Sequence, residues 1–483
     1  MSDLFNLQAI EPRLLQRHQQ QSLDKPTLPT LTTIQAAESS LPDPSSPSYL
    51  AGQAQERVAR HIVDDIVPAL CGQSQSSRYF GFWADNVVSR MDQNVQVHLP
   101  SQTVSTKVED AALEMLVHLL RLGGGGEWKG RTFTTGATAS NVLGLACGRE
   151  AILGKRLGGR LVLVNSLSKA ASIVGLGRLS VKELRRSEAQ PWKLDLDAVE
   201  RELRREGTAN IIAVSAGEVN TGRYALDDVD EWKRLRELAD RYGAWIHVDG
   251  AFGIFSRALE DRDEYKLLHT RDEGVGLADS ITVDGHKLLN VPYDCGMFLT
   301  RSPSVLQSIF TNPNAAYLSS SSSSSGASIP SPLNIGIENS RRFRALPAYA
   351  VLLSEGRPGL AGLFHNMAQL SRRLAVFLRD SPHYELLPNG EEEEGGKSTA
   401  AADIDEIFVI VLFRARDRAL NQVLVEKING TRQMYVSGTS WKGEKAVRVA
   451  VSNWKVDVER DFKVVTRILS DVAEGREFDI EKC

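Results

Sequence analysis

From about residue 131 onward, short apolar runs alternate with helical patterns, and this alternation restricts the possible folds more than any other feature of the chain. The apolar runs include residues 161–164, 211–214, 245–248 and 280–283, and residues 227–242 have a helical pattern. Runs of this length and composition are typical of buried strands. Strand and helix signals in alternation predict an α/β fold, in which helices cover both faces of a largely parallel sheet.

The composition is that of a large globular protein and excludes several other classes. The chain has 483 residues, of which 42% are hydrophobic and 24% charged, and its formal net charge is −4. These proportions argue against wholesale disorder, and the length predicts about two to four structural units. The near balance of charge provides no broad basic surface for nucleic acid or anionic lipid. We therefore expect no nucleic-acid partner, no membrane partner, and a small molecule as the substrate.

Cysteine usage and the N-terminus favour a cytoplasmic location. The four cysteines are widely spaced and form no CxxC pair. A disulfide framework or a zinc site is therefore not expected, and a reducing compartment fits. Residues 1–33 lack the apolar core and the small-residue cleavage site of a secretory signal. We expect no membrane helix, because no segment approaches the roughly 20 uninterrupted apolar residues that such a helix needs.

Three parts are expected along the chain: an N-terminal arm with a helical segment over residues 1–105, a large domain over 106–370, and a small α+β domain over 371–483. A serine run at 319–325 and an acidic run at 391–394 are expected to be loops, because neither can bury apolar surface. The serine run is also a candidate lid. Further helices are expected over 49–70, 108–122 and 457–469, and further strands over 407–412 and 446–451.

A loop of small residues that enters a helix is the first of three segments placed where strands should end. Residues 134–141 form this loop, which includes Gly136, Ala137 and Thr138, and a helical pattern follows over 142–153. Open α/β sheets bind their ligands at such strand ends. Free N–H groups at a helix start suit a phosphate, although tight packing alone also produces loops of this kind. No Gly-Lys-Ser/Thr follows, so the loop is not a nucleotide-binding P-loop.

The second and third segments place an acid and a lysine directly after strands. Asp249 follows residues 245–248, whereas His286 and Lys287 follow residues 280–283. An acid at a strand end often only caps a turn, but its carboxylate can also stabilise a protonated ring nitrogen. A lysine beside a buried strand is unusual, and desolvation would let its amine form a Schiff base. Together with a phosphate loop, the acid and the lysine favour a pyridoxal 5′-phosphate (PLP) site.

The ordered combination of these segments resembles the group II PLP-dependent amino-acid decarboxylases. Three further stretches carry the resemblance, namely GEVNTG at 217–222, PYDCG at 292–296 and SRRFRALP at 340–347, and it covers roughly residues 80–454. The family includes aromatic-amino-acid, tyrosine, histidine and glutamate decarboxylases. The resemblance implies the fold-type I transferase architecture, with a mostly parallel seven-stranded sheet flanked by helices. It also implies a homodimer that swaps its N-terminal segments and has active sites at the subunit interface.

The resemblance further implies roles for individual residues. Lys287 would form the Schiff base with PLP, Asp249 would pair with the pyridine nitrogen, and Ala251 would pack under the ring. His286 would lie beside the cofactor and is the third expected catalytic residue. The expected cofactor-binding residues are Gly136, Ala137, Thr138, Asn220, Asp249, Ala251, Asp284, His286, Lys287 and Ser340.

Other polar and aromatic residues have two interpretations each. Trp83, Asn94 and His98 are candidates for the substrate pocket, although core packing would explain Trp83 and an interface would explain His98. The arginines of residues 341–344 could bind phosphate or carboxylate through their planar guanidinium groups, and we expect at least one of them to form a structural ion pair. Cys295 is expected to pack after the lysine strand. No metal site is expected.

Two departures from the family pattern bear on the reaction. Relatives usually stack a histidine on the cofactor ring, and the matching position here falls on Val164 or Asn165. Many relatives carry a tyrosine in their mobile loop, and residues 326–339 contain none. Lys287, His286 or water would then supply the proton, or the chain would use oxygen and release an aldehyde.

We therefore expect a carboxy-lyase that uses PLP to decarboxylate an L-amino acid. One alternative is PLP-dependent oxidative decarboxylation–deamination, which gives an aldehyde. The other alternative is a catalytically silent PLP-binding dimeric scaffold, which the presence of both Lys287 and Asp249 disfavours. Phe80 and Trp83, near the expected entrance, point to an aromatic or bulky apolar substrate.

Overall fold

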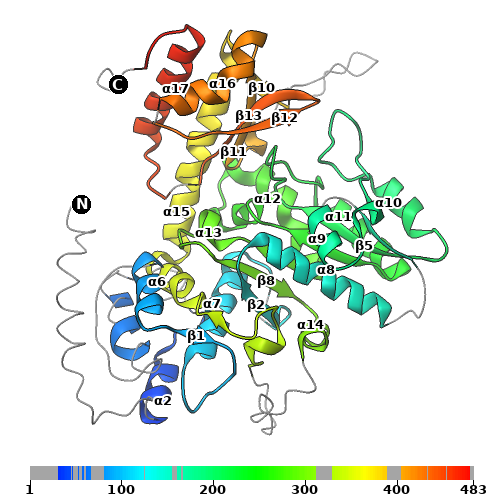
Figure 1. Ribbon diagram of the computed structural model, residues 1–483, viewed down its shortest axis with the longest axis vertical. Helices are drawn as coiled ribbons and strands as arrows, with labels where there is room; N and C mark the ends of the chain where they lie inside the picture. The colour runs from blue at the N-terminus through cyan, green and yellow to red at the C-terminus, as the bar shows by residue number, and fades with distance from the viewer. Residues whose placement is uncertain are drawn as a thin grey trace.

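A mixed seven-stranded sheet forms the centre of the computed structural model (Figure 1). In order across the sheet, its strands are β2 (Gly130–Thr134), β8 (Gly296–Thr300), β7 (Ser280–Val283), β6 (Trp245–Asp249), β5 (Thr208–Ser215), β3 (Arg160–Val164) and β4 (Val181–Lys182). The strands from β7 to β4 pair in parallel, whereas β8 is antiparallel to both of its neighbours. The expected α/β fold with a mostly parallel seven-stranded sheet is thus confirmed.

The structure describes residues 31–44, 46, 53, 57–58, 61–66, 81–123, 126–154, 160–164, 167–311, 329–388, 404–431, 433–452 and 454–478. The serine run, the acidic run and most of the helix expected over 49–70 lie outside these residues. Within the described residues, no helix has the length and apolar character that crossing a membrane requires.

Helices flank the sheet, and two of them, α10 and α11, begin with an aspartate that caps the first turn. They are α7 (Ser105–Leu119), α8 (Ala137–Leu153), α9 (Ser168–Ile173), α10 (Leu196–Leu203), α11 (Val229–Tyr242), α12 (Lys266–Asp272), α13 (Gly285–Leu288) and α14 (Pro303–Phe310). In α11, the Asp228 carboxylate accepts hydrogen bonds from two free N–H groups of the first turn, and Gly243 ends the helix at φ 68°. α7 starts three residues earlier than expected and ends at Leu119. Short 3₁₀ segments cover Arg178–Ser180, Gly253–Ala258, Asp263–Tyr265 and Glu273–Leu277.

Helix α8 lies unusually close to the sheet. It packs against β5, β6, β7 and β8. The approach requires a glycine, because a Cβ atom on Gly144 would lie 2.1 Å from Cε1 of His247 in β6. The start of α8, which follows β2 directly, is thereby fixed against the strands that carry the other two candidate segments.

A second, four-stranded antiparallel sheet lies toward the C-terminus, at the top of Figure 1. Its order is β10 (Tyr384–Leu387), β11 (Ile410–Ala415), β13 (Glu444–Ala450) and β12 (Ser437–Trp441), and it is accompanied by 3₁₀ segment η9 (Ile404–Glu406), α16 (Arg418–Gly430) and α17 (Val458–Ala473). The strand expected over 407–412 begins only at Ile410. The three apolar residues before it are buried, but they do not belong to the paired strand. The long helix α15 (Ala345–Asp380) bends at Gly356 and contacts α7 and α17. It crosses residue 370, so both sides of that expected boundary share one helix.

The described N-terminal elements lie at the bottom of Figure 1, where α6 packs against α15, α2 packs against η2, and His61 of η2 contacts Tyr349 of α15. They are α2 (Leu31–Ser40), the π-helix η2 (His61–Ile66), α6 (Gly81–Arg90) and β1 (Asn94–Val95). Strand β1 pairs with β9 (Arg341–Arg342), which follows the 3₁₀ segment Pro332–Asn334. This pairing fixes the region of residues 94–98 beside the start of α15.

Candidate active site

Three strand ends meet at one edge of the large sheet. Because β8 is antiparallel to both β2 and β7, strand β2 runs in the same direction as β6 and β7. Strand β2 leads into α8, β6 ends at Asp249, and β7 leads into the single turn of α13 that carries Lys287. The three segments singled out in the sequence therefore converge at the edge where parallel α/β sheets bind ligands.

A chain of buried hydrogen bonds holds the Asp249 carboxylate. Its Oδ1 accepts from the backbone N–H of Ala251 (3.1 Å), and its Oδ2 accepts from Nδ2 of Asn141 in α8 (2.8 Å). Burial raises the pKa of Asp249, whereas these two hydrogen bonds and the charge of Lys287 oppose the rise. The carboxylate is thus a buried acid whose ionised form depends on donors that the fold supplies.

The Asn141 amide is itself oriented by His247. Burial lowers the pKa of His247 to about 3, so its ring is neutral. Its Nε2 lies 3.0 Å from Oδ1 of Asn141, an amide oxygen that can only accept, so the proton of the neutral ring is on Nε2. Its Nδ1 therefore accepts from the Ser280 hydroxyl at 2.8 Å. This direction leaves the Asn141 NH₂ group free to donate to the carboxylate.

Lys287 lies between an acid and an aromatic ring. Its Nζ is 3.1 Å from Oδ2 of Asp284 and 4.2 Å from the centre of the Phe252 ring. The side chain retains 23% of its exposure. The lysine is therefore only partly desolvated and has a charged partner, rather than being isolated in an apolar pocket as the strand position suggested.

Asp284 also contacts the start of α8. Its Oδ2 accepts a hydrogen bond from the backbone N–H of Ala137 (3.3 Å). Its Oδ1 lies 3.0 Å from Nδ1 of His286. Yet Oδ1 has no hydrogen-bond partner among the described residues, and Nδ1 accepts from the N–H of Cys295 (3.3 Å). The carboxylate is only 2% exposed, so it is a buried acid with one unsatisfied oxygen.

Two glycines allow the loop before α8 to lie close to β8 and to His286. A Cβ atom on Gly136, which has φ +156°, would lie 3.1 Å from Cε1 of His286. A Cβ atom on Gly296 in β8 would lie 2.5 Å from Cα of Gly136. Close approach of this loop to β8 and to His286 therefore needs both glycines.

The small sheet contributes an arginine to the same region. The guanidinium of Arg448, in β13, lies 5.4 Å from the centre of the Phe252 ring, and its Nε donates to the backbone oxygen of Val219 (2.5 Å). One terminal nitrogen, Nη2, is buried without a hydrogen-bond partner in the described part of the chain. Burial lowers the pKa of Arg448, and the charge of Glu218 opposes this. Phe252 thus contacts a cation from each of the two sheets.

Most expected cofactor-binding residues are brought together, and others are not. Gly136, Ala137, Asp249, Ala251, Asp284, His286 and Lys287 lie in the cluster just described, and Thr138 is exposed in the first turn of α8. Asn220 instead bonds to β12, through the Ser440 backbone oxygen and the Thr439 hydroxyl. Ser340 is exposed in the turn before β9.

The substrate-pocket candidates lie in the N-terminal region. Asn94 is exposed in β1, opposite Arg342. His98 is buried against α7, where its Nδ1 lies 2.7 Å from the Thr106 hydroxyl, and burial lowers its pKa. Trp83 belongs to α6, but its side chain is outside the described part of the structure, as are the Val164 side chain and all of Asn165.

The three arginines of residues 341–344 all form ion pairs. Arg341, whose side chain is 1% exposed, makes a two-pronged contact with the buried Glu109 of α7. Arg342 pairs with Asp85 (2.6 Å) and Arg344 with Asp294 (3.2 Å). The expectation of a structural ion pair is confirmed for this segment. Cys295 is buried and its pKa is raised by burial, in keeping with the packing role expected for it.

The sequence alone assigns no role to four further site residues. Asn141, His247 and Phe252 lie in or beside the segments singled out in the sequence, whereas Arg448 comes from the distant strand β13. Tyr293 is 80% exposed, with its ring 4.3 Å from that of His286. This phenol lies in the PYDCG stretch, well before residues 326–339, where the family pattern placed one.

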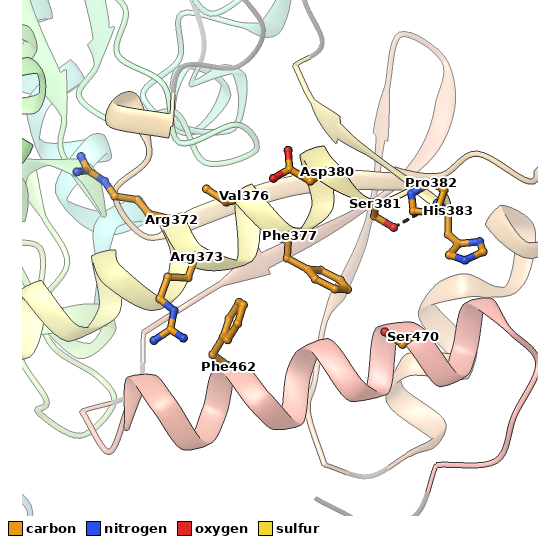
Figure 2. A pocket seen from close by; sticks show the side chains of 10 residues that line it. All are labelled: Arg372, Arg373, Val376, Phe377, Asp380, Ser381, Pro382, His383, Phe462 and Ser470. Atoms are coloured by element: carbon orange, nitrogen blue, oxygen red, sulfur yellow. Dashed lines mark hydrogen bonds between the residues drawn. The ribbon is translucent and has the colours of Figure 1, made fainter.

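A separate hollow of about 630 Å³ lies between α15 and α17 (Figure 2). Phe377 and Phe462 face each other across it, and the Arg373 guanidinium lies 4.3 Å from the Phe462 ring centre. None of its lining residues belongs to the cluster around Lys287.

Comparison with known proteins decides the family. The model of the pyridoxal-dependent decarboxylase conserved domain matches residues 37–396. The chain belongs to this family. The family is named for its dependence on pyridoxal, so the expected family and cofactor are confirmed.

Individual relatives are distant. The chain is 24% identical to a tryptophan decarboxylase of Camptotheca acuminata over 59% of its length and 54% of the relative's. It is 25% identical to the L-2,4-diaminobutyrate decarboxylase of Acinetobacter baumannii, over 63% and 56%. It is 23% identical to the 4-hydroxyphenylacetaldehyde synthase of Rhodiola rosea, over 78% and 74%. The matches thus span little more than half the length of the first two relatives.

Solved structures share the fold over almost the whole chain. Oryza sativa TDC, solved with PLP and tryptamine, aligns with a TM-score of 0.69 at 19% identity and covers 98% of this chain and 99% of that one. The Rhodiola rosea synthase aligns with a TM-score of 0.67 at 19% identity, with 98% of each chain covered. The fold-type I architecture expected from the resemblance is therefore confirmed.

The residues of the cluster fit PLP. A phosphate needs N–H donors, and the start of α8 supplies them beside two glycines that keep side chains away. A pyridine nitrogen needs an acid, and Asp249 is a buried acid whose carboxylate is held by two donors. An aldehyde needs an amine, which Lys287 offers beside Phe252. Among the described residues, no group of three or more His, Cys, Asp or Glu is arranged to hold a metal ion.

Proposed function

We propose that this chain catalyses the decarboxylation of an L-amino acid, in which the amino acid takes up one proton and gives CO₂ and an amine. The convergence of Lys287, Asp249 and the start of α8 at one sheet edge carries the proposal. Bound PLP supplies an electron sink for the carbanion that loss of CO₂ leaves. The remaining work of attachment, charge pairing and orientation falls to the side chains of the site.

Lys287 is the attachment point for the cofactor. Its amine must lose a proton and leave Asp284, 3.1 Å away, before it can bond to the cofactor carbonyl. The Phe252 ring, 4.2 Å from Nζ, limits water on one side. His286 is next to Lys287 and in contact with the Tyr293 ring, and because its Nδ1 accepts the Cys295 N–H, its Nε2 is the atom placed to hold or move a proton.

Asp249 pairs with the pyridine nitrogen and keeps it protonated. Burial alone would neutralise this acid, and the donors Asn141 and Ala251 favour its charged form. Ala251, whose N–H binds the same carboxylate, would lie under the cofactor ring.

Arg448 is the cation for a substrate carboxylate. It reaches the site from the small sheet, stacks on Phe252 and keeps one buried nitrogen without a partner among the described residues. A carboxylate there would satisfy that nitrogen. Phe252 favours an aromatic or bulky apolar amino acid, and relatives named for tryptophan and for 4-hydroxyphenylacetaldehyde agree with this.

Oxidative decarboxylation–deamination is the second candidate. In it an amino acid, O₂ and water give an aldehyde, CO₂, ammonia and hydrogen peroxide. The absence of tyrosine from residues 326–339 and the likeness to the Rhodiola rosea aldehyde synthase favour it.

A panel of L-amino acids tests both reactions. The PLP-loaded protein is assayed for CO₂, amine, aldehyde and peroxide together. CO₂ with an equal amount of amine supports decarboxylation, and aldehyde with peroxide supports the second candidate. A loaded protein that turns over no amino acid would overturn both in favour of a binding scaffold. Lys287→Ala must abolish turnover, whereas Lys233→Ala, on the exposed face of α11, must not.

We further propose a cytoplasmic homodimer with active sites at the subunit interface, N-terminal segments swapped between subunits, and the three-part division at residues 105 and 370. The exposed positions of Ser340 and Tyr293 fit a partner that covers them. Light scattering of the loaded protein should give twice the chain mass of 53.1 kDa. A monomer that is fully active would contradict the shared site.

A further inference from the structure

The position of Asp284 is unexpected for a phosphate site. Its carboxylate accepts the N–H of Ala137, the first residue of α8, and this N–H is one of the donors that a phosphate would use. The carboxylate is buried, and one of its oxygens has no hydrogen-bond partner among the described residues. A fixed negative charge therefore already occupies part of the space to which a phosphate dianion must come.

Attachment of the cofactor breaks the contact between Asp284 and its present cationic partner. This partner is Lys287, whose amine must leave the carboxylate to bond to the cofactor carbonyl. His286 presents Nδ1 to the unsatisfied oxygen while accepting the N–H of Cys295, so it donates nothing to the carboxylate in this arrangement. Asp249, whose charge also acts on this region, is a second acid and adds no compensating cation.

We propose that Asp284 competes with the cofactor phosphate for the N-terminus of α8. This competition makes PLP binding weaker and more readily reversible than the N–H donors at that N-terminus alone would allow. Without cofactor, the carboxylate satisfies the Ala137 N–H and holds the Lys287 ammonium. With cofactor, it must release this N–H to the phosphate and remain nearby as an unfavourable charge. The proposal concerns the cofactor of the family and does not depend on which reaction the loaded protein catalyses.

A comparison of two ligands with two proteins isolates the effect. Dissociation constants for PLP and for pyridoxal, which has the aldehyde and the ring but no phosphate, are measured by equilibrium dialysis with detection of ligand absorbance. Both ligands use the Lys287 amine, so loss of the Lys287–Asp284 contact cancels in the ratio of the two constants. Only the interaction between phosphate and carboxylate remains.

In Asp284→Asn, the preference for PLP over pyridoxal should rise at least tenfold relative to the unmodified protein. Asp284→Ser removes the same charge without an amide and should shift the preference in the same direction. Asp294→Asn is the matched control, because this acid pairs with Arg344 and accepts no hydrogen bond from α8. Its preference should not change.

Inorganic phosphate tests the same competition with a ligand that has no aldehyde. In the cofactor-free protein, phosphate should raise the thermal midpoint more strongly for Asp284→Asn than for the unmodified chain. An unchanged or reduced preference for PLP in both Asp284 variants would overturn the proposal, since the carboxylate would then not oppose the phosphate. Failure to turn over amino acids, by contrast, would count against the proposed reaction and leave these binding ratios unaffected.

Discussion

The buried carboxylate of Asp272 makes the stability of the protein depend on pH in a predictable direction. Asp272 ends α12, is 1% exposed, and accepts a hydrogen bond from the Ser256 hydroxyl in the 3₁₀ segment that follows β6. Burial raises its pKa to about 7, although the charge of Arg257 opposes this. An acid whose pKa is raised by folding is protonated more easily when folded, so its contribution to stability is present at low pH and is lost as pH rises through about 7.

The size of the effect follows from the shift. The pKa rises from 3.8 to about 7 on folding, and each unit corresponds to ~1.4 kcal/mol. Between about pH 5 and pH 8 the unmodified chain should therefore lose about 3 kcal/mol of unfolding free energy through this one group. Asp272→Asn cannot ionise, so its loss over the same interval should be smaller by that amount.

Urea unfolding followed by tryptophan fluorescence measures this difference. Protein concentration and PLP are held constant at both pH values, because binding shifts apparent stability. Asp263→Asn is the control, since this exposed acid of a neighbouring 3₁₀ segment makes no comparable buried contact. An equal loss of stability between the two pH values in Asp272→Asn and in the unmodified protein would refute the assignment of a raised pKa to Asp272.

Three further outcomes test the packing of the site. Asn141→Leu removes a hydrogen bond to the Asp249 carboxylate worth ~2 kcal/mol, so the pH at which the absorbance of bound PLP changes should shift by about 1.5 units, and an unchanged titration would contradict the proposed orientation. Gly144→Ala should lower the thermal midpoint by several degrees, because its Cβ would lie 2.1 Å from a histidine ring atom, whereas Gly362→Ala on α15 has open space and should not lower it. Arg341→Met leaves a buried glutamate without its cation and should cost ~3–5 kcal/mol of unfolding free energy, measured by urea titration.

Local sequence patterns were sufficient for the centre of the site. The strands before Asp249 and Lys287 are short apolar runs, and parallel strands deliver their carboxyl ends to one edge of a sheet, so both residues could be placed from the sequence alone. The small-residue start of α8 followed from the same rule. The exact ends of elements are less well determined by such patterns, as the early start expected for β11 illustrates: Ile407, Phe408 and Val409 are buried but precede the paired strand.

Contacts between distant segments could not be obtained in this way. Arg448 is one of two arginines in the strands of the small sheet, and only the approach of β13 to the loop at Val219 distinguishes it from Arg414. His247 lies within an apolar run and has no local feature that indicates a buried polar contact. Its role follows from the close approach of α8, which depends on the absence of a side chain at Gly144.

Helix α8 also fixes the spacing between three contacts of the site. Ala137, Asn141 and Gly144 are spaced four and three residues apart and so lie on one face of the helix. In the proposed complex, the Ala137 N–H would face the phosphate and the Asn141 amide would hold the acid for the ring nitrogen, while Gly144 sets the distance to the sheet. The first two residues are separated by about 6 Å along the axis, at 1.5 Å per residue. Because one helix carries both contacts, a slide of the helix would misplace both of them at once.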